Sequence, residues 1–425
     1  METVVKELKV SKMAENLVGS EIIKLAGEIK EKIAQGEHIY NFTIGDFNPE
    51  IFPIPNALKS EIIEAYTNNI TNYPASNGMA ELRSSVSDYL SKNINLDYSA
   101  DDILISGGAR PLIYAVYQAL IDPEDTVVFP VPSWNNNHYT HLSHGKQVFI
   151  ETTPEQNFMP TATDFKDHIK DATLIALCSP LNPTGTVFSK EQLSSICEMV
   201  LEENNRRGEN EKPLYVIYDQ IYWQLTYGET THYNPVSLYP EMRDYTIFID
   251  GISKAFAATG VRVGWAFGPN KIISKMKSIL GHVGAWAPKA EQIATGKFLD
   301  NSEACETYLS WITKEALNRL NGFYNGIQAL KQKGYPVDAI APQAAIYLTV
   351  RFDFKGKTTE NGTLLETTKD VTAYLLNEAK LAVVPFYAFG ANSESPWYRL
   401  SVGTASESDV AGTLKNLEGA ILKLK

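Results

Sequence analysis

Short β-rich runs alternate with helical stretches from about residue 52 to residue 310, and this alternation restricts the fold more than any other feature. Parallel strands need a crossover connection, usually a helix, so the pattern is typical of a mostly parallel sheet with helices on both faces. The candidate strands are residues 103–106, 126–129, 147–150, 174–177, 214–219, 246–250 and 261–267. The sequence therefore predicts an α/β fold whose large domain has a seven-stranded, mostly parallel sheet between helices.

The chain on both sides of this region predicts a smaller α+β domain. Apolar residues recur at helical spacing over residues 14–35, and Gly36 gives a stop signal before the extended run 39–43. Beyond about residue 310 the chain has strand and helix patterns of its own and ends in an amphipathic helix at 409–424. We therefore expect an N-terminal arm with part of the small domain (1–51), a large domain (52–310) and a small C-terminal domain (311–425).

Composition and charge exclude several classes of protein. The chain has 425 residues, of which 44% are hydrophobic and 21% are charged, as in globular proteins. Its formal net charge of −12 argues against binding to nucleic acid or to anionic membranes, which need a basic surface. The first residues lack the apolar core of an export signal, and no stretch approaches the roughly 18 apolar residues of a membrane span. We therefore expect a cytoplasmic enzyme with small-molecule substrates.

The cysteines predict neither a disulfide framework nor a metal site. Only Cys178, Cys197 and Cys305 are present, and they lack the short spacings of metal-binding and redox motifs. An odd and sparse set of this kind is typical of reduced thiols in a protein core.

One lysine occurs in an unusual setting. Lys254 lies in the segment 251–264, just past a predicted strand and among small residues. Most lysines are solvated, because burial of an ammonium group whose ordinary pKa is about 10.4 is costly. A lysine at a strand end among small residues therefore indicates a depressed pKa or a covalent role, although a surface lysine would fit the same letters.

Other strand ends carry residues suited to binding. Gly107 and Gly108 join a strand to a helix start, where free backbone amides and the helix dipole favour an anion. Asp219 ends an apolar strand, Asn182 lies in a Pro-Leu-Asn-Pro-Thr-Gly turn, and Trp134 follows a Pro-Val-Pro-Ser run. Taken alone, each also fits an ordinary role as a tight turn, a helix cap or a core aromatic residue.

Together these segments resemble the motifs of the class I and II aminotransferases, the fold-type I pyridoxal-phosphate enzymes, and aspartate aminotransferases in particular. The motifs occur in the family's order, and the resemblance extends over nearly the whole chain. It implies that the large domain binds the cofactor pyridoxal 5'-phosphate and that Lys254 holds it as an imine. The freed amine of Lys254 would then act as the catalytic base and acid. Arg262, eight residues later, would pair with the phosphate.

The resemblance also implies the remaining cofactor contacts. Asp219 would keep the pyridine nitrogen protonated, so that the ring withdraws electrons from the substrate's α-carbon. The other implied contacts are those of Gly108 and Ala109 with the phosphate, Trp134 with the ring face, Asn182 and Tyr222 with the ring oxygen, and Tyr73 with the phosphate of a neighbouring subunit. The last of these contacts predicts a homodimer with shared active sites.

For the substrate, the resemblance implies that Arg399 binds the α-carboxylate while Gly45 and Asn182 approach it. L-Aspartate and 2-oxoglutarate are the default pair, exchanged in a ping-pong reaction. Two positions depart from the family pattern. Gly251 lacks a hydroxyl that many members offer to the phosphate, and Ala109 lacks a side-chain donor found in some. A further contact, with Ser253 as the candidate, would have to compensate.

Three other functions remain open at this stage. The substrate can instead be an aromatic amino acid, since several aromatic residues lie in segments near the implied site: Phe47, Phe52, Trp286, Tyr387 and Phe389. Relatives with the same motifs catalyse β-elimination or ring closure. Related domains also serve as effector-binding halves of transcription regulators, which carry a basic DNA-binding extension that we do not expect here.

Overall fold

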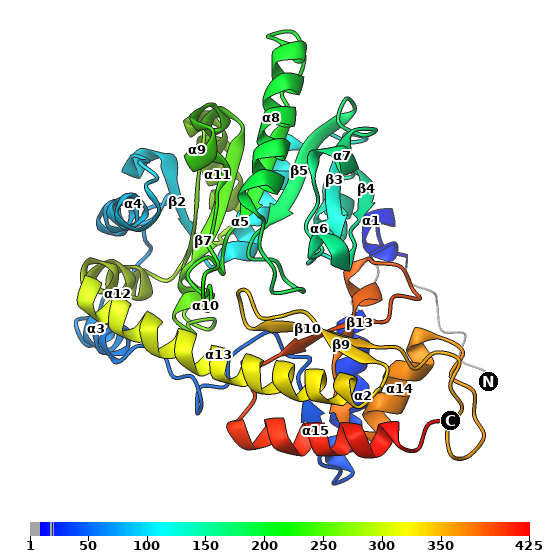
Figure 1. The fold of residues 1–425 in the computed structure, drawn as a ribbon. Helices are drawn as coiled ribbons and strands as arrows, with labels where there is room; N and C mark the ends of the chain where they lie inside the picture. The colour runs from blue at the N-terminus through cyan, green and yellow to red at the C-terminus, as the bar shows by residue number, and fades with distance from the viewer. Residues whose placement is uncertain (1–8, 18, 20) are drawn as a thin grey trace, which may run out of the picture.

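The computed structural model describes residues 9–17, 19 and 21–425. The expectation about an export signal concerns residues 1–8, which lie outside the described residues. A large layered domain with its sheet between helices occupies the upper part of Figure 1, and a smaller domain with its own short sheet lies below it. The α/β fold class and the smaller α+β domain are therefore confirmed, whereas the exact division of the chain at residues 51 and 310 stays a prediction.

The large sheet has the predicted seven strands. They are β2 (Ile103–Ser106), β3 (Thr126–Val131), β4 (Lys146–Glu151), β5 (Ala172–Cys178), β6 (Tyr215–Asp219), β7 (Thr246–Gly251) and β8 (Gly264–Phe267). Their order across the sheet is β2-β8-β7-β6-β5-β3-β4. β8 pairs antiparallel with both of its neighbours, and the other pairs are parallel.

The strands of this sheet alternate their side chains between two apolar cores. In β6, Val216 and Tyr218 face one core and Ile217 faces the other. In β7, Phe248 and Ile249 divide in the same way. Because helices cover both faces, neither side of a strand needs polar residues, which explains the near-continuous apolar runs in the sequence.

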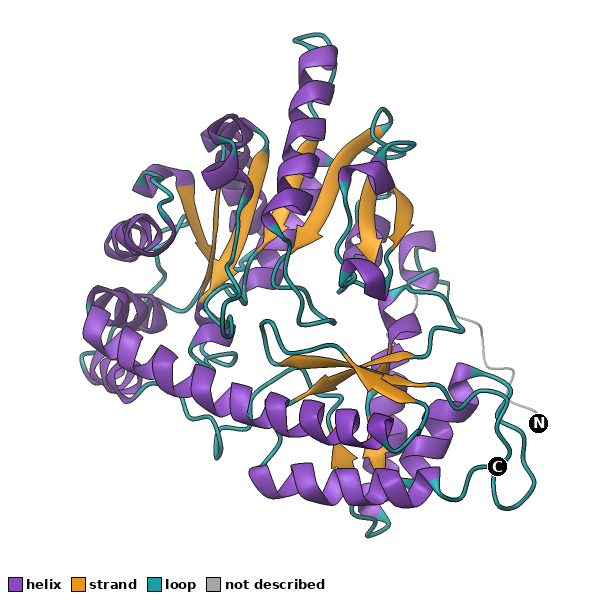
Figure 2. Ribbon diagram, in the orientation of Figure 1, coloured by secondary structure: helices purple, strands orange, loops and turns teal. Residues whose placement is uncertain are grey.

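Helices cover both faces of the large sheet (Figure 2). They are α3 (Asn56–Thr67), α4 (Ala80–Ile94), α5 (Ala109–Leu120), α6 (Asn136–Leu142), α7 (Ala162–Phe165), α8 (Lys190–Arg207), α9 (Pro235–Leu238), α10 (Ile252–Ala255), α11 (Asn270–Val283) and α12 (Lys289–Asp300), with 3-10 turns η1 (Ala100–Asp102), η2 (Pro154–Gln156) and η3 (Pro240–Asp244). α5 and α11 pack on one core, and α4, α8 and α12 pack on the other. Within the described part of the chain, no helix combines the length and the apolar character that crossing a membrane requires.

The small domain combines the N-terminal arm with the C-terminal segment. Its strands are β9 (Val337–Ala339), β10 (Tyr347–Phe352), β12 (Val384–Pro385) and β13 (Trp397–Ser401), in the antiparallel order β12-β13-β10-β9, and β1 (Tyr40–Asn41) with its parallel partner β11 (Leu381–Ala382). Its helices are α2 (Glu21–Ala34), α14 (Thr368–Glu378) and α15 (Glu407–Ile421), with the turn η4 (Phe386–Phe389). The short helix α1 (Lys12–Glu15) of the arm lies beside the large domain (Figure 1), where the carbonyl oxygen of Met13 accepts a hydrogen bond from His141 Nε2 at 2.8 Å. The long helix α13 (Ser302–Gln332) passes beneath the large domain (Figure 1).

The predicted N-terminal helix and the last predicted strand of the large sheet differ from the structure at their starts. The helix expected over residues 14–35 is present as α1 and α2, and residues 18 and 20 between them lie outside the described residues. β8 begins at Gly264 instead of residue 261, because Arg262 has a φ of +62°, a left-handed conformation that cannot continue a strand. The apolar alternation before Gly264 therefore belongs to a loop that turns Arg262 toward Gly107 and Gly108, at the start of α5.

The carboxyl ends of the parallel strands meet at one edge of the sheet, which faces the small domain. The strand-end residues at this edge are Ser106, Val131, Cys178, Asp219 and Gly251. Ligands of open α/β sheets bind at this edge, because the loops and helix N-termini that follow the strands converge there. The fold therefore places the sequence motifs that follow β2, β3, β5, β6 and β7 around one region.

We expect Gly264→Ala to destabilise the protein, because β8 passes very close to the start of α5. A Cβ at position 264 would lie 2.7 Å from the carbonyl carbon of Gly108 and 2.9 Å from the nitrogen of Ala109. Both atoms belong to the backbone, so relief requires the sheet and helix to move apart, at about 1–3 kcal/mol. The urea midpoint of unfolding should fall accordingly.

Gly281→Ala in α11 is the matched control, because an added Cβ there meets no atom of the described residues within 4 Å. Alanine is favoured over glycine inside a helix by roughly 0.5–1 kcal/mol, so this variant should be as stable as the parent or slightly more so. Equal midpoints for the two variants would show that the close approach at Gly264 is not a constraint.

Candidate active site

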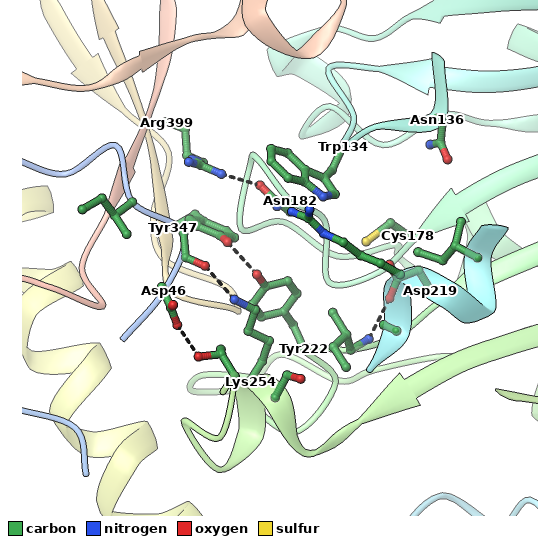
Figure 3. Close-up of a pocket in the computed structure, with 18 of the residues that line it drawn as sticks. Asp46, Trp134, Asn136, Cys178, Asn182, Asp219, Tyr222, Lys254, Tyr347 and Arg399 are labelled. Atoms are coloured by element: carbon green, nitrogen blue, oxygen red, sulfur yellow. Dashed lines mark hydrogen bonds between the residues drawn. The ribbon is translucent and has the colours of Figure 1, made fainter. Parts of the chain in front are cut away.

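A cavity of about 610 Å³ lies at the strand-end edge of the large sheet, between it and the small domain. Residues of both domains line it, and Figure 3 shows how the polar ones point toward one another. The predicted site residues along its wall are Gly45, Ala109, Trp134, Asn182, Asp219, Tyr222, Lys254, Arg262 and Arg399, together with Ser253. Segments more than 350 residues apart in the sequence therefore meet here.

Lys254 lies in the short helix α10, which follows β7, and its amine points across the cavity. Nζ donates a hydrogen bond to the carbonyl oxygen of Gly45 at 2.6 Å (Figure 3). Burial lowers the pKa of Lys254 to about 8, and nearby arginines act in the same direction while Asp46 opposes them. A larger fraction of this amine is therefore neutral near pH 7 than for a surface lysine, as attack on an aldehyde requires.

Asp219 ends β6 and presents a carboxylate to the cavity. One oxygen accepts a hydrogen bond from the backbone nitrogen of Ile221 at 3.1 Å, and no cation among the described residues forms an ion pair with Asp219. Burial raises the pKa of Asp219 to about 6, and the charge of Lys254 opposes this effect. A buried carboxylate without a paired cation is suited to hold a protonated ring nitrogen.

An anion-binding end of the cavity forms where α5 begins. Gly108 precedes the helix with a φ of +94°, and the guanidinium of Arg262 lies against it, so that a Cβ at Gly108 would be 2.1 Å from Nη2. Arg262 donates to the carbonyl oxygens of Thr259 at 2.7 Å and Gly107 at 2.8 Å. Glycine at 108 thus leaves room for an arginine beside free helix amides, an arrangement suited to a phosphate group.

A carboxylate-binding end lies on the opposite side, at Arg399 of β13. This side chain is only 2% exposed, and its Nη1 donates to Asn182 Oδ1 at 2.9 Å while Nη2 donates to the carbonyl oxygen of Thr43 at 2.6 Å. Its Nε has no hydrogen-bond partner among the described residues. Burial lowers the pKa of Arg399, so the buried guanidinium is stabilised further when an anionic partner is present.

A tyrosine that the sequence did not point out connects Tyr222 with the carboxylate-binding end of the cavity. Tyr347 of β10 shares a hydrogen bond of 2.5 Å with the hydroxyl of Tyr222, and its ring lies 4.8 Å from the guanidinium of Arg399. A Cβ at Gly45 would be 2.8 Å from the Tyr347 hydroxyl, so Gly45 permits this approach. Burial raises the pKa of Tyr222, which keeps its hydroxyl protonated as a hydrogen-bond donor.

Arg110 is a second residue that the sequence did not single out, although it lies within a motif. It follows Ala109 in α5 and lines the cavity, where its guanidinium carbon is 5.4 Å from the centre of the Trp134 ring. It forms no hydrogen bond or ion pair with another described residue. A basic residue after a glycine pair at a helix start was the available signal, whereas Tyr347 lies in an apolar run that gives none.

Two predicted site residues, Gly108 and Tyr73, are not among those that line the cavity: Gly108 precedes the lining residue Ala109, whereas Tyr73 lies elsewhere. Tyr73 is 81% exposed and packs edge-on against Trp286 at 5.4 Å between ring centres. It does not line the cavity of its own chain.

The residues present fit pyridoxal phosphate. The cavity offers an anion-binding end at Gly108 and Arg262, an aromatic wall at Trp134 and an unpaired buried carboxylate at Asp219. The amine of Lys254 faces the same space. A phosphate, a flat ring and a protonated ring nitrogen each have a complementary group here.

Comparisons with known proteins agree with this arrangement. Residues 37–413 match the family model described as aminotransferase class I and II. The aspartate aminotransferase of Bacillus subtilis (strain 168) is 28% identical over 422 residues, which cover 98% of each chain. That of Bacillus sp. (strain YM-2) is 28% identical over 91% of this chain and 93% of its own length.

Solved structures give the same result. The crystal structure of the aspartate aminotransferase from Rhizobium meliloti superposes with a TM-score of 0.90 at 26% identity and covers 99% of this chain and 100% of its own. The structure of the aspartate aminotransferase from Thermus thermophilus with maleate superposes with a TM-score of 0.85 at 25% identity, and the match covers 97% of this chain and 100% of that one. The chain therefore belongs to the aminotransferase class I and II family and is a pyridoxal-phosphate-dependent aminotransferase.

Proposed function

We propose that the enzyme moves an amino group from L-aspartate to 2-oxoglutarate in a ping-pong reaction. Two arginines in one cavity carry this assignment, because each substrate has two carboxylates. Arg399 is buried at one end, and Arg110 lies on the wall without an anionic partner among the described residues. Charged hydrogen bonds from guanidinium groups to carboxylates are strong and directional. The curated relatives named above are aspartate aminotransferases, and the Thermus structure contains maleate, a dicarboxylate.

In this proposal Arg399 binds the substrate's α-carboxylate together with Asn182, whose amide oxygen already accepts from Nη1. The unpaired Nε of Arg399 leaves a donor for the substrate. Arg110 binds the distal carboxylate while stacked on Trp134. The two carboxylates then fix the α-carbon between them, so that its C–H bond is held toward Lys254.

Proton transfer falls to Lys254. Bound pyridoxal phosphate supplies an electron-withdrawing ring that stabilises negative charge at the substrate's α-carbon. The neutral amine of Lys254 would accept the α-proton and then deliver it to the cofactor carbon that is bonded to the substrate nitrogen, as transamination requires. Asp219 would keep a proton on the ring nitrogen, and the hydroxyl of Tyr222 would donate a hydrogen bond to the ring oxygen. Gly108, Ala109 and Arg262 bind the phosphate in this scheme, with Ser253 as a further donor in the cavity wall.

Lys254→Ala should reduce turnover by at least about 100-fold, because the variant lacks both the covalent anchor and the general base. Borohydride treatment after incubation with pyridoxal phosphate should label Lys254 in the parent protein, as mass spectrometry would show. Lys275→Ala in α11 is the control, since Lys275 is exposed and remote from the cavity. Wild-type rates in Lys254→Ala, or labelling at another lysine alone, would exclude the assignment.

Arg110→Met should lower kcat/KM for aspartate by about 10- to 150-fold, the loss expected for a charged hydrogen bond worth about 1.5–3 kcal/mol. Activity toward an uncharged amino acid such as tyrosine should change little. Arg110→Lys retains the positive charge and should recover part of the aspartate activity. An equal decrease in kcat/KM for aspartate and tyrosine would show that Arg110 does not bind the side-chain carboxylate of aspartate.

The aromatic amino acid alternative receives less support from the cavity. None of the five aromatic residues considered from the sequence lines it: Phe47, Phe52, Trp286, Tyr387 and Phe389. Phe47 and Phe52 are buried in the small-domain core, and Phe389 packs on Arg399 at 4.9 Å. The β-eliminating alternative is also not favoured, since the named relatives are aminotransferases.

We also propose a homodimer with shared active sites, supported by the position of Tyr73. Apolar side chains are also exposed on α3 and at the end of α11, including Ile63, Tyr66 and Val283. Exposed apolar groups of this kind mark interaction surfaces. Tyr73 would cross this surface to the phosphate bound in the partner.

The protein should therefore sediment at twice the 47.2 kDa of one chain. Tyr73→Phe should weaken binding of pyridoxal phosphate without changing the sedimentation coefficient, because only a hydroxyl is removed from the shared site. Tyr66→Phe serves as the control, since the Tyr66 hydroxyl bonds to Glu291 of its own chain. A monomer at assay concentrations would refute the shared site.

We assign the reaction to the cytoplasm, on the support of the acidic composition and of three free cysteines. Thiols remain reduced in that compartment. Cell fractionation followed by an activity assay would check the assignment.

A further inference from the structure

We propose that Asp46 is a positioning residue that acts through Lys254, placing a counter-charge beside the amine and fastening the Gly45 segment to the loop behind the lysine. This inference rests on the role proposed above for Lys254. Asp46 precedes Phe47 in the N-terminal arm and lines the cavity (Figure 3).

The first support is a pair of hydrogen bonds between the arm and the lysine loop. Asp46 Oδ1 accepts from the hydroxyl of Thr259 at 2.7 Å, and the carbonyl oxygen of Gly45 accepts from Lys254 Nζ at 2.6 Å. Lys254 lies in α10 and Thr259 in the loop that follows this helix, five residues later. Two adjacent residues of the arm are thus joined to the segment that carries Lys254 at two points.

The carboxylate of Asp46 is held in place on both sides. Its Oδ1 also accepts from the backbone nitrogen of Phe47 at 2.8 Å. The carbonyl oxygen of Asp46 lies so close to Gly403 that a Cβ there would be 2.1 Å away, and Asn48 donates its backbone N–H to Gly403 at 2.9 Å. The segment after β13 therefore packs against the backbone of the arm at Asp46, and the Asp46 carboxylate remains at the cavity.

Thr259 extends the connection to the anion-binding end of the cavity. Its carbonyl oxygen accepts from Arg262 Nη1 at 2.7 Å, while its hydroxyl donates to Asp46. The loop from Lys254 to Arg262 is thereby joined to the arm at one end and to the start of α5, through the bond from Arg262 to Gly107, at the other. Asp46 is thus the residue of the arm at which this series of hydrogen bonds begins, and it contributes a carboxylate to it.

The charges around Lys254 give Asp46 a distinct effect. The charged and titratable groups that face the amine are Asp46, Arg110, Asp219, Tyr222, Arg262 and Arg399. Burial and the three arginines disfavour the ammonium form, whereas Asp46 favours it and is the strongest of these charges. The pKa of Lys254, lowered to about 8, thus reflects these opposing effects. Removal of Asp46 would lower this pKa further.

This balance matters when the amine takes up the substrate's α-proton. The neutral amine would become an ammonium ion among three arginines, and Asp46 is the carboxylate with the largest stabilising effect on that charge. While Lys254 is bonded to the cofactor it cannot donate to Gly45 as a free ammonium. The bond between Thr259 and Asp46 then remains to hold the Gly45 segment beside Lys254 and the substrate's carboxylate site.

A matched pair of variants separates the charge from the hydrogen bond. Asp46→Asn removes the charge but keeps an oxygen that accepts from Thr259 and Phe47. Thr259→Val keeps the charge but removes the donor. In cofactor-free protein, competitive acetylation with acetic anhydride across a pH series, read by mass spectrometry, gives the titration midpoint of Lys254 without reference to enzyme activity.

We expect Asp46→Asn to lower this midpoint by about one pH unit, because an opposite charge near the amine is lost. The acidic limb of the kcat profile with aspartate should move in the same direction. Thr259→Val should leave the midpoint near that of the parent while raising KM for aspartate severalfold, since the Gly45 segment is loosened. Asp46→Ser is a second neutral variant that keeps an acceptor, and melting temperatures would check the folding of all three.

A midpoint for both neutral variants that equals the parent's would overturn the inference, because a purely structural Asp46 predicts no change. Failure of the proposed function has a different signature. If Lys254 does not bind the cofactor, addition of pyridoxal phosphate gives no borohydride-stable label at this lysine, whereas the acetylation midpoints still report on Asp46.

Discussion

The concentration of positive charge in one buried cavity is the constraint on which the rest of the structure depends. Arg262 lies at one end, Arg399 at the other, and Lys254 between them. Charges removed from water are costly unless they are paired, so the chain supplies carbonyl acceptors at Thr43, Gly45, Gly107 and Thr259. Carbonyl groups offset only part of this cost, because they carry partial charges. The cavity is consequently built for ligands that bring a phosphate and carboxylates, and the selectivity for anions follows from the protein's own electrostatics.

The fold supplies this arrangement by bringing two independent apolar cores together around the site. The large sheet carries Asp219 and Lys254 at its strand ends, and the antiparallel sheet of the small domain carries Tyr347 and Arg399 on the same face of neighbouring strands. Strands packed on both faces hold their ends to within a narrow range of positions. Small residues then allow the closest approaches, as Gly108 does for the guanidinium of Arg262. Rigid sheets on both sides fix the distances that proton transfer requires, whereas flexible loops alone would not.

The sequence predicted the parts of this structure that depend on local pattern. All seven strands of the large sheet lie where apolar runs indicated them, because both faces of that sheet are buried. The start of β8 was placed too early, since a positive φ at Arg262 has no signature in an apolar alternation. Tyr347 and Asp46 were beyond reach for a different reason. The contact of Tyr347 with Tyr222 and that of Asp46 with Thr259 span 125 and 213 residues, and no local pattern specifies such pairs.

The carboxylates of Asp219 and Asp46 line the same cavity but have different surroundings, which suit them to different roles. Asp219 ends a central strand, where burial raises its pKa to about 6 and leaves it in need of a cation. Asp46 lies on the arm, where the hydroxyl of Thr259 and the backbone N–H of Phe47 donate hydrogen bonds to it. A carboxylate that needs a cation is suited to a ligand that supplies one. Asp46 already accepts hydrogen bonds from the protein, so its carboxylate remains available to act on Lys254 when a ligand is bound. Lys254 thus has one carboxylate that is suited to the ligand, Asp219, and one that acts on the lysine itself, Asp46.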